Sequence, residues 1–391
     1  MIKSFILQMP RAIHFGPGER NNLPKVIRPL GARVLLFSGQ HWFAKSGWQE
    51  RFLELLEPFQ LLSLQCPGGE PEVEALNVLL EQARAFKPDV IVAVGGGSVL
   101  DTAKAVSGLL PVRENVEDYL EGIGKGLALE HPGVPWIALP TTSGTGAEVT
   151  KNAVLKSKAV GAKKSLRSPF LLATCALVDP ELTVGAPLSL SGIAGMDALV
   201  QLVEAFVSRK AAPIPRALAR QAFPAMLEAL RGIPRDPDDL EARTGAAYGA
   251  MVSGIALANS GLGAAHGFAS GLGGLFDIPH GLICALFIRP VLKANAELIR
   301  DDCAALLQGA LEQGAADRQA VAAGGKDPVQ WLIGEFDSLF SLYDLPENLK
   351  GFAIDASQVP EIARRSSGSS MSGNPRELSQ QERETMFAAL L

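Results

Sequence analysis

Short apolar runs alternate with amphipathic stretches over the first half of the chain. Four of the runs are predicted buried strands: Arg33–Gly39, Leu61–Gln65, Asp89–Val94 and Val134–Leu139. Three stretches between them have helical spacing: Trp48–Pro58, Pro71–Phe86 and Ser98–Leu110. Strands that alternate with helices in this way predict a parallel sheet that is covered on both faces.

After about residue 186 the predicted strands stop, and long stretches with helical spacing follow. These predicted helices are Ser191–Arg209, Ile214–Arg231, Leu240–Asn259, Ile283–Gln313, Pro328–Phe340 and Ser379–Leu391. A proline-containing segment at 179–187 separates the two patterns. We therefore expect an α/β domain over 1–185 and an all-helical domain over 186–391.

The segment 244–276 contains no charged side chain, which raises the question of a membrane span. Its many glycines, together with Asn259 and His266, favour a pair of buried helices in a globular core instead. We expect no membrane partner. The first residues also lack the long apolar core of a signal peptide, because Pro10 and Arg11 interrupt them.

The composition narrows the function classes. The 391 residues include 36 Lys and Arg against 41 Asp and Glu, so the net charge is −5. A mildly acidic chain with 6% aromatic residues lacks the basic footprint of a nucleic-acid-binding protein. The four cysteines form no CxxC pair, which predicts a reduced, cytoplasmic chain and argues against a cysteine-ligated zinc; they are Cys66, Cys175, Cys284 and Cys303.

Two loops in the first half are candidates for phosphate binding. The run Gly95-Gly-Gly-Ser98 follows an apolar strand and opens a helix, so its backbone N–H groups can face an anion. The stretch 140–148, PTTSGTGAE, follows the next predicted strand and is rich in hydroxyls. Each loop alone also fits an ordinary turn. Because ligands of open α/β sheets bind at the carboxyl ends of the strands, the two together predict one bound dinucleotide.

The second half contains a candidate metal site. His266 lies within the charge-free segment, and His280 follows shortly after it. Asp197 offers a carboxylate, with Gln201 one helical turn further on. Two imidazoles and a carboxylate are common ligands of Zn²⁺ and related ions. The same residues also fit a hydrogen-bonded core, and spacing alone leaves both interpretations open.

Five motifs, in this order, resemble those of the iron-containing (group III) alcohol dehydrogenase family: GGGSVLDTAKA (95–105), PTTSGTGAEVT (140–150), LVDPEL (177–182), GMDALVQLVEAFVS (195–208) and AHGFASGLGGLFDIPHG (265–281). The resemblance covers nearly the whole chain. It implies a dehydroquinate synthase-like architecture, with a Rossmann-like N-terminal domain and an all-helical C-terminal domain. It also implies a cofactor and a metal held between the two domains.

The resemblance further implies roles for individual residues. Asp197, His266 and His280 correspond to metal ligands and would form the catalytic centre, with Fe²⁺ or Zn²⁺ as the ion. The implied cofactor-binding residues are Gly96, Gly97, Ser98, Asp101, Thr141, Thr142, Thr145, Asn152 and Lys164.

Two positions depart from the family pattern. Gln201 stands where the family has a further histidine ligand, and a neutral amide oxygen is a poor ligand for Fe²⁺ or Zn²⁺. The alternatives are a metal bound weakly with Gln201 as a ligand, a different ion, or no metal. Ser270 stands where many members have a proton-relaying histidine, and serine does not titrate near neutral pH. Water or a ribose hydroxyl would then relay the proton.

The end of the first core strand bears on the choice of cofactor. Family members that prefer NAD often place an aspartate there to bond the ribose 2′-hydroxyl, whereas this chain has Gly39. Without a carboxylate, a 2′-phosphate is not repelled. We therefore expect binding of NAD or NADP, with NADP tolerated or preferred.

The resulting prediction is an NAD(P)-dependent alcohol dehydrogenase of the iron-containing type, which interconverts an alcohol and an aldehyde or ketone by metal-assisted hydride transfer. One alternative is a reductase of maleylacetate-like keto acids, for which Arg209, Lys210 and Lys293 are candidate cations. The other is a metal-poor dinucleotide-binding protein with little activity. The resemblance implies a homodimer or larger assembly, with the strand-like segments Ile2–Gln8 and Ala12–Phe15 in the interface or in a local hairpin.

Overall fold

The computed structural model describes residues 4–40, 42–158, 161–319 and 327–391. These residues form two compact units. The sheet unit contains Gln8–Thr142 and Gly146–Gly185, and the helical unit contains Ala186–Leu391 together with the segment 143–145 and the described part of 1–7. The main boundary between the units therefore lies between Gly185 and Ala186. Two short segments from the first half of the chain, within 1–7 and at 143–145, belong to the helical unit.

The sheet unit is built on a six-stranded sheet in the order β1-β8-β5-β4-β2-β3. All five pairs of neighbouring strands run parallel, which confirms the predicted sheet type. The strands are β1 (Ala12–Phe15), β2 (Arg33–Gly39), β3 (Gln60–Cys66), β4 (Val90–Gly95), β5 (Trp136–Pro140) and β8 (Cys175–Val178).

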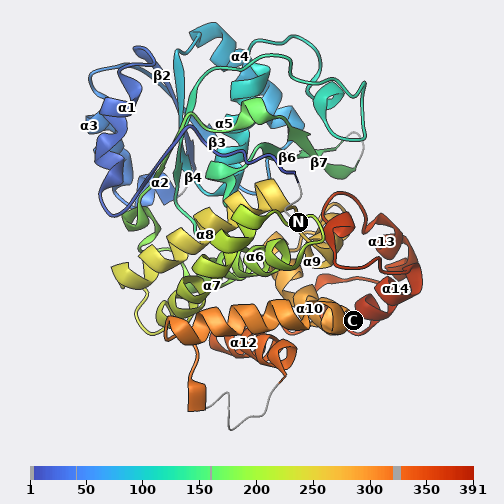
Figure 1. The fold of residues 1–391 in the computed structure, drawn as a ribbon. Coiled ribbons are helices and arrows are strands. Elements are labelled where there is room, and N and C mark those ends of the chain that lie inside the picture. The colour runs from blue at the N-terminus through green and yellow to red at the C-terminus, as the bar shows by residue number, and fades with distance from the viewer. Residues whose placement is uncertain (1–3, 41, 159–160, 320–326) are drawn as a thin grey trace. The chain divides into compact units, whose positions relative to one another are not determined.

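Helices cover both faces of this sheet, as the apolar pattern of the strands requires. Figure 1 shows α1 and α3 on one side and α4 and α5 on the other. The helices of this unit are α1 (Leu23–Ile27), α2 (Trp42–Lys45), α3 (Trp48–Leu56), α4 (Val73–Phe86) and α5 (Gly97–Leu109). Successive side chains of β2 point to opposite faces, and both sets are buried: Leu36 packs with Phe52 of α3 in one core, and Phe37 is buried too.

Two parts of the sheet unit differ from the sequence-based expectations. β1 pairs in parallel with β8 and so belongs to the main sheet, not to a local hairpin with the preceding segment. Of the predicted strand Ile2–Gln8, residues 2 and 3 lie outside the described residues, and 4–8 have no strand conformation. An antiparallel hairpin of β6 (Asn152–Ser157) and β7 (Ala162–Arg167) was not predicted, because its polar alternation lacks a continuous apolar run.

In its described residues, the helical unit contains all six helices that the apolar spacing predicts, with two more. Its helices are α6 (Leu188–Val207), α7 (Pro213–Gly232), α8 (Leu240–Ser260), α9 (Ala264–Leu272), α10 (His280–Glu312), α12 (Pro328–Leu342), α13 (Val359–Arg365) and α14 (Gln380–Ala388). Side-chain caps fix several starts: Asp239 caps α8, and Ser379 forms a capping box with Glu382 on α14.

Short 3₁₀ helices complete the described structure of both units. They are η1 (Glu19–Asn22), η2 (Val116–Tyr119), η3 (Ala147–Val149), η4 (Pro169–Leu171), η5 (Pro180–Thr183), η6 (Lys350–Phe352), η7 (Ala356–Gln358) and η8 (Met371–Gly373).

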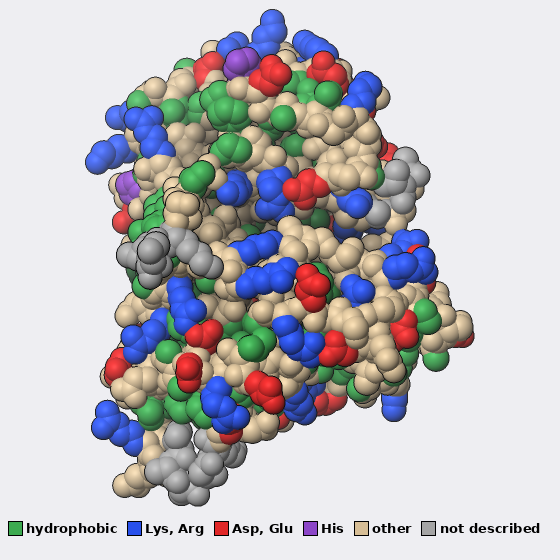
Figure 2. Space-filling view, turned by 45° about the vertical axis from the view of Figure 1, so that its right-hand side comes forward, with side chains coloured by type: hydrophobic (Ala, Val, Ile, Leu, Met, Phe, Trp, Pro, Cys, Tyr) green, Lys and Arg blue, Asp and Glu red, His purple; other side chains and the backbone are tan. Residues whose placement is uncertain are grey.

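The charge-free segment 244–276 forms most of α8 and all of α9, both largely buried, which agrees with the buried-pair interpretation. Among the described residues, one helix, α6, is long and apolar enough to cross a membrane. Of its most apolar window, 78% is buried inside the protein, as expected for a core helix. On the face drawn in Figure 2, basic side chains lie interspersed with acidic, apolar and uncharged ones.

Glycine lets α10 approach α6 closely at the point where the two helices carry polar side chains. A Cβ atom on Gly281 would lie 2.3 Å from the carbonyl oxygen of Ile193 and 3.0 Å from Cβ of Asp197. Any larger residue would push the start of α10 away from α6. This contact therefore sets the distance between Asp197 and the side chains at the start of α10.

Candidate active site

Asp197 is a buried carboxylate on α6, and one of its oxygens is held by Gln201. The Gln201 amide nitrogen donates to Asp197 Oδ2 over 3.1 Å, and the Gln201 oxygen accepts from the Ser253 hydroxyl over 2.8 Å. The predicted shared helix face of Asp197 and Gln201 is thus confirmed. Asp197 Oδ1 has no hydrogen-bond partner among the described residues.

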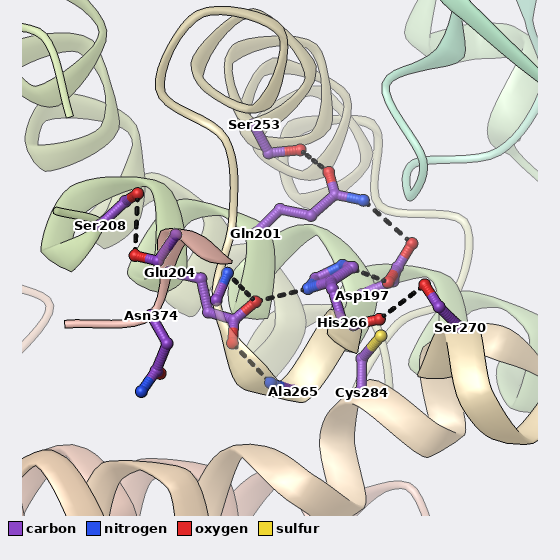
Figure 3. Close-up of polar contacts among 12 residues, drawn as sticks. Asp197, Gln201, Glu204, Ser208, Ser253, Ala265, His266, Ser270, Cys284 and Asn374 are labelled. Carbon is purple, nitrogen blue, oxygen red and sulfur yellow. Dashed lines mark hydrogen bonds and ion pairs between the residues drawn. The ribbon is translucent and has the colours of Figure 1, made fainter. Parts of the chain in front are cut away.

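His266, the third residue of α9, is oriented by Glu204. Nδ1 of His266 lies 2.7 Å from Glu204 Oε2, and Glu204 also accepts from the backbone N–H groups of Gly263 and Ala265. A carboxylate at Nδ1 fixes the proton there and turns Nε2 the other way. Nε2 lies 3.3 Å from Asp197 Oδ1 and makes no hydrogen bond within the described structure. Figure 3 shows Glu204, His266 and Asp197 in this sequence.

α10 contributes His280 at its first residue and Cys284 one turn later. Nε2 of His280 lies 3.9 Å from Asp197 Oδ1 and 3.6 Å from Sγ of Cys284. One ligand atom from each of Asp197, His266, His280 and Cys284 lies within 4.8 Å of every other. We call these four residues the ligand cluster; Figure 3 shows Cys284 beside His266 and Asp197.

The electrostatics of the ligand cluster favour a cation. Burial alone would lower the pKa of both histidines, but Cys284 and Asp197 outweigh it; the pKa of His266 lies well above its ordinary value, and that of His280 rises to about 9. Burial would raise the pKa of Asp197, but the neighbouring histidines and Cys284 lower it. The acidic groups thus hold positive charge on the imidazoles, and a metal ion can supply the same charge.

The residues present fit a divalent metal. Asp197 Oδ1 and His266 Nε2 are buried, make no hydrogen bond within the described residues and lie 3.3 Å apart as an ion pair, so a metal ion in place of the imidazole proton would engage both atoms. Carboxylate, imidazole and thiol groups are the donors that Zn²⁺ accepts. In contrast, the amide nitrogen and oxygen of Gln201 form hydrogen bonds with Asp197 and Ser253.

Cys284 is the functional candidate that the sequence-based reasoning missed. The absence of a CxxC pair argued against a cysteine-ligated zinc, whereas the structure places Cys284 among the candidate ligands. The available signal was the spacing: Cys284 follows His280 by four residues, as Gln201 follows Asp197. It went unused because the predicted helix began at Ile283, after His280, whereas α10 begins at His280.

The glycine-rich loop lies at the carboxyl end of the sheet, as predicted. β4 ends at Gly95, Gly96 precedes the first residue of α5, and the first N–H groups of that helix are free of helical partners by geometry. Gly95 is in register with Pro140 of β5, and Thr141 donates its N–H to the Gly95 carbonyl over 3.0 Å. Both candidate phosphate loops therefore meet at one sheet edge.

Glycine lets the two candidate phosphate loops approach each other closely. A Cβ atom on Gly96 would lie 3.3 Å from the Thr142 side chain, so the two loops are in close contact. At the end of β2, a Cβ on Gly39 would make an ordinary 3.8 Å contact with Val99. Gly39 thus lies beside the first turn of α5.

The remaining predicted cofactor residues divide into two groups. Asn152 carries a buried Oδ1 atom without a hydrogen bond in the described part of the chain, and Lys164 is partly buried on β7. Asp101 instead has both oxygens engaged, by Lys104 and by the Val154 N–H group. Thr145 belongs to the segment 143–145 of the helical unit, where Gly144 packs against Ala194 of α6.

The residues behind the alternative predictions are also placed. The Ser270 hydroxyl donates to the His266 carbonyl over 3.0 Å. Arg209 and Lys210 donate to the carbonyls of Ser372 and Ser369, so their charges are tied to that loop. Lys293 is exposed on α10. None of these contacts specifically favours a keto-acid reductase.

Comparison with known proteins agrees with this fold. Residues 10–180 match the family profile described as "Iron-containing alcohol dehydrogenase", and 192–391 match that of the family's C-terminal part. The chain is 32% identical over 360 residues to long-chain-alcohol dehydrogenase 1 of Geobacillus thermodenitrificans, covering 91% of this chain and 88% of that one.

Two further similarities extend over the full length. The chain is 29% identical over 389 residues to the NADPH-dependent butanol dehydrogenase of Clostridium saccharobutylicum, covering 97% of this chain and 96% of the other. A solved structure of 1,3-propanediol oxidoreductase superposes with a TM-score of 0.90 at 27% identity, covering 100% of both chains. The protein belongs to the iron-containing alcohol dehydrogenase family and is an NAD(P)-dependent oxidoreductase of that type.

Proposed function

We propose that this protein reduces an aldehyde or ketone to its alcohol, and reverses the reaction, at the ligand cluster with NADP as the preferred cofactor. The observation that carries the proposal is the pair of buried, unbonded atoms, Asp197 Oδ1 and His266 Nε2, that face one another across 3.3 Å. A folded protein keeps such atoms unbonded where a ligand is to engage them.

The sheet unit would hold the cofactor. Gly96, Gly97 and Ser98 would receive the pyrophosphate at the start of α5, with the hydroxyls of Thr141 and Thr142 beside them. The open Oδ1 atom of Asn152 would accept a hydrogen bond from the cofactor, and Lys164 and Thr145 would make further contacts. Asp101 would act indirectly, by holding the hairpin at Val154. When bound, the nicotinamide supplies or accepts the hydride.

The helical unit would hold the metal and the carbonyl substrate. Asp197, His266 and His280 would be the metal ligands, and the ion, Fe²⁺ or Zn²⁺, would polarise the carbonyl oxygen as a Lewis acid. Glu204 fixes the His266 tautomer, and Gln201 orients the Asp197 carboxylate, so both would hold the metal ligands in position through hydrogen bonds. Ser270 offers no titratable group, so the alcohol proton would reach solvent through water or a ribose hydroxyl.

Gly39 supports the NADP preference. The end of β2 has no carboxylate to bond a 2′-hydroxyl or to repel a 2′-phosphate. A relative named as an NADPH-dependent butanol dehydrogenase covers nearly the whole chain. Turnover with NADH equal to or better than turnover with NADPH would contradict this preference.

A homodimer or larger homo-oligomer in the cytoplasm is the assembly that we propose. β1 is an edge strand of the sheet, and edge strands pair readily with another chain. Phe5 and Ile6, just before β1, expose 40% and 77% of their surfaces, which a partner subunit would cover. All four cysteines are unpaired and buried, as in a reducing compartment.

The proposal is tested with the purified protein, stripped of metal and reloaded with Fe²⁺, Zn²⁺ or Mn²⁺. NADPH and NADH oxidation are followed with a panel of aldehydes, ketones and keto acids. We expect reduction of neutral aldehydes that is faster than that of keto acids, and at least about 10³-fold slower in an Asp197→Asn variant, because metal polarisation is worth several kcal/mol. Asp337→Asn on the surface of α12 is the matched control. Reduction of no carbonyl with any of the metals would refute the proposal.

A further inference from the structure

We infer that the Cys284 thiolate is the fourth protein ligand of the metal, in the role that the family pattern gives to the residue at position 201. This inference rests on the proposed metal site and specifies its ligand set as Asp197, His266, His280 and Cys284. It adds a sulfur donor to the oxygen and nitrogen donors that the family resemblance implies.

Three of the six distances within the ligand cluster lie close to the edges of a tetrahedron around one ion. Bonds of about 2.0–2.3 Å to oxygen, nitrogen and sulfur place neighbouring ligand atoms about 3.3–3.8 Å apart. The observed distances are 3.3 Å from His266 to Asp197, 3.6 Å from His280 to Cys284 and 3.9 Å from His280 to Asp197. Sγ of Cys284 thus lies at a ligand-to-ligand distance from His280 and within 4.8 Å of the other two ligand atoms.

The site does not rest on the cysteine alone. The side chains of Asp197 and His266 are 4% and 5% exposed, and each aims an atom without a hydrogen bond at the centre of the cluster. Cys284 is buried on the same side, from α10, which Gly281 holds against α6. Three helices therefore bring four donors to one point.

Gln201 is left out of the ligand set because its amide nitrogen donates to Asp197, while its oxygen shares the Ser253 hydroxyl with the Ala250 carbonyl. Turning the amide over would place its oxygen against the carboxylate oxygen, which is repulsive. The neutral amide thus helps to hold Asp197, while the thiolate supplies the negative charge and the polarizable donor that a borderline-soft ion prefers.

The thiol loses its proton to solvent when the metal binds, so the ion replaces that proton and no oxidant or reductant is required. Thiolate favours Zn²⁺ over harder ions such as Mn²⁺. We therefore expect the Zn²⁺-loaded protein to be the tightest of the loaded forms that contain Zn²⁺, Fe²⁺ or Mn²⁺.

The test replaces the metal in the full-length protein with Co²⁺, whose absorption spectrum shows a near-ultraviolet charge-transfer band only when a thiolate is bound. The wild-type spectrum needs no mutant and is the first readout. We expect the band in the wild type and in Cys303→Ser, a matched variant of another buried cysteine on α10, and its loss in Cys284→Ser. Zn²⁺ affinity, measured by competition with a chelator, should fall about 100-fold or more in Cys284→Ser, since outer partners alone are worth about 10–100-fold.

The outcomes separate this inference from the proposed function. A wild-type protein that binds Co²⁺ without the band, or a Cys284→Ser variant that keeps the band, overturns the cysteine ligand even if aldehydes are still reduced. A protein that binds no Co²⁺ also overturns it. The band with no carbonyl reduction upholds the ligand set and counts against the proposed dehydrogenase reaction.

Discussion

The two units each contain a buried cluster of charged groups, and the clusters differ in how completely their atoms are bonded. In the sheet unit, the Lys104 ammonium is fully buried and has three partners: Asp101 at 3.2 Å, the Thr150 hydroxyl at 2.9 Å and the Asn152 carbonyl at 2.7 Å. In the helical unit, Asp197 Oδ1 and His266 Nε2 are equally buried but have no hydrogen bonds within the described structure.

The contrast distinguishes a structural cluster from a site. Three donors on Lys104 meet three acceptors, so nothing remains for a ligand, and the cluster ties α5 to the β6 hairpin. The ligand cluster keeps donor atoms free and holds them from behind with Glu204 and Gln201. Burial and charge are therefore shared by both clusters. The ligand cluster differs because its unbonded atoms belong to metal-ligating side chains whose ligand atoms all lie within 4.8 Å of one another.

The largest expected effect on stability comes from removing Lys104 from its fully bonded cluster in the sheet unit. Lys104→Met leaves the Asp101 carboxylate buried without its cation, and removing one partner of a buried pair costs about 3–5 kcal/mol of unfolding free energy. Chemical denaturation measures the loss. The double variant Lys104→Met/Asp101→Asn removes the stranded charge and should recover part of it; a loss below about 1 kcal/mol in the single variant would show that the cluster is not structural.

The next effect concerns Glu204, which orients His266 in the ligand cluster. Glu204→Gln keeps the size of the side chain but places an amide among three donors, from Gly263, Ala265 and His266. We expect metal affinity to fall about 10–100-fold, as for other residues that orient a ligand. Chelator competition measures it, with Glu228→Gln on the surface of α7 as the control. Unchanged affinity would mean that Glu204 does not orient His266.

A smaller effect, on the preference between NADPH and NADH, is expected at Gly39, the last residue of β2. Gly39→Asp adds a carboxylate where the Cβ position has only an ordinary contact, so the fold should accept it. The new charge would bond a 2′-hydroxyl and repel a 2′-phosphate, and charged hydrogen bonds are worth about 1.5–3 kcal/mol. We expect the ratio of kcat/KM for NADPH to that for NADH to fall about tenfold. A ratio that does not change would place the adenosine ribose elsewhere.

The smallest effect tests a carboxylate that is fully bonded but partly exposed. Asp89 accepts from the Arg33 side chain and from the N–H groups of Arg33 and Ala32, and these bonds lower its pKa to about 2. A lowered pKa in the folded state means stability that is present above the unfolded pKa of about 3.9 and lost as pH falls toward 2.

With exposure taken into account, Asp89→Asn should cost about 1 kcal/mol at pH 7, and the difference should shrink between pH 4 and 2. Urea denaturation at several pH values measures it, with Asp337→Asn as the exposed control. A difference that stays constant with pH would mean that the Asp89 charge is not what stabilises this turn.

Much of the fold followed from apolar periodicity, because the core strands and helices bury continuous faces. β2 agrees with its predicted limits, Arg33–Gly39, and β4 and β5 agree within two residues at each end. The β6–β7 hairpin and the parallel partner of β1 did not follow, since polar alternation and strand pairing depend on residues far away in the chain.

The site was predictable in part for the same reason. Asp197, His266 and His280 were identified by type and by family resemblance, and the structure brings them together. Glu204 was missed because its importance lies in contacts across helices, which no spacing within one helix reveals. Cys284 was missed because the predicted helix began after His280, which hid the four-residue spacing between them. Gln201 was expected as a weak ligand, and its place against Ser253 depends on α8, a separate helix.

The central claim is hydride transfer to a carbonyl at the ligand cluster, and a labelled cofactor tests it most directly. The protein is given NADPH with deuterium at nicotinamide C4 and an aldehyde, and the alcohol is analysed by mass spectrometry. We predict one deuterium on the carbonyl carbon with metal-loaded wild type, and almost none with metal-stripped protein or Asp197→Asn. Equal deuterium transfer by all three, or transfer by none, would contradict the account.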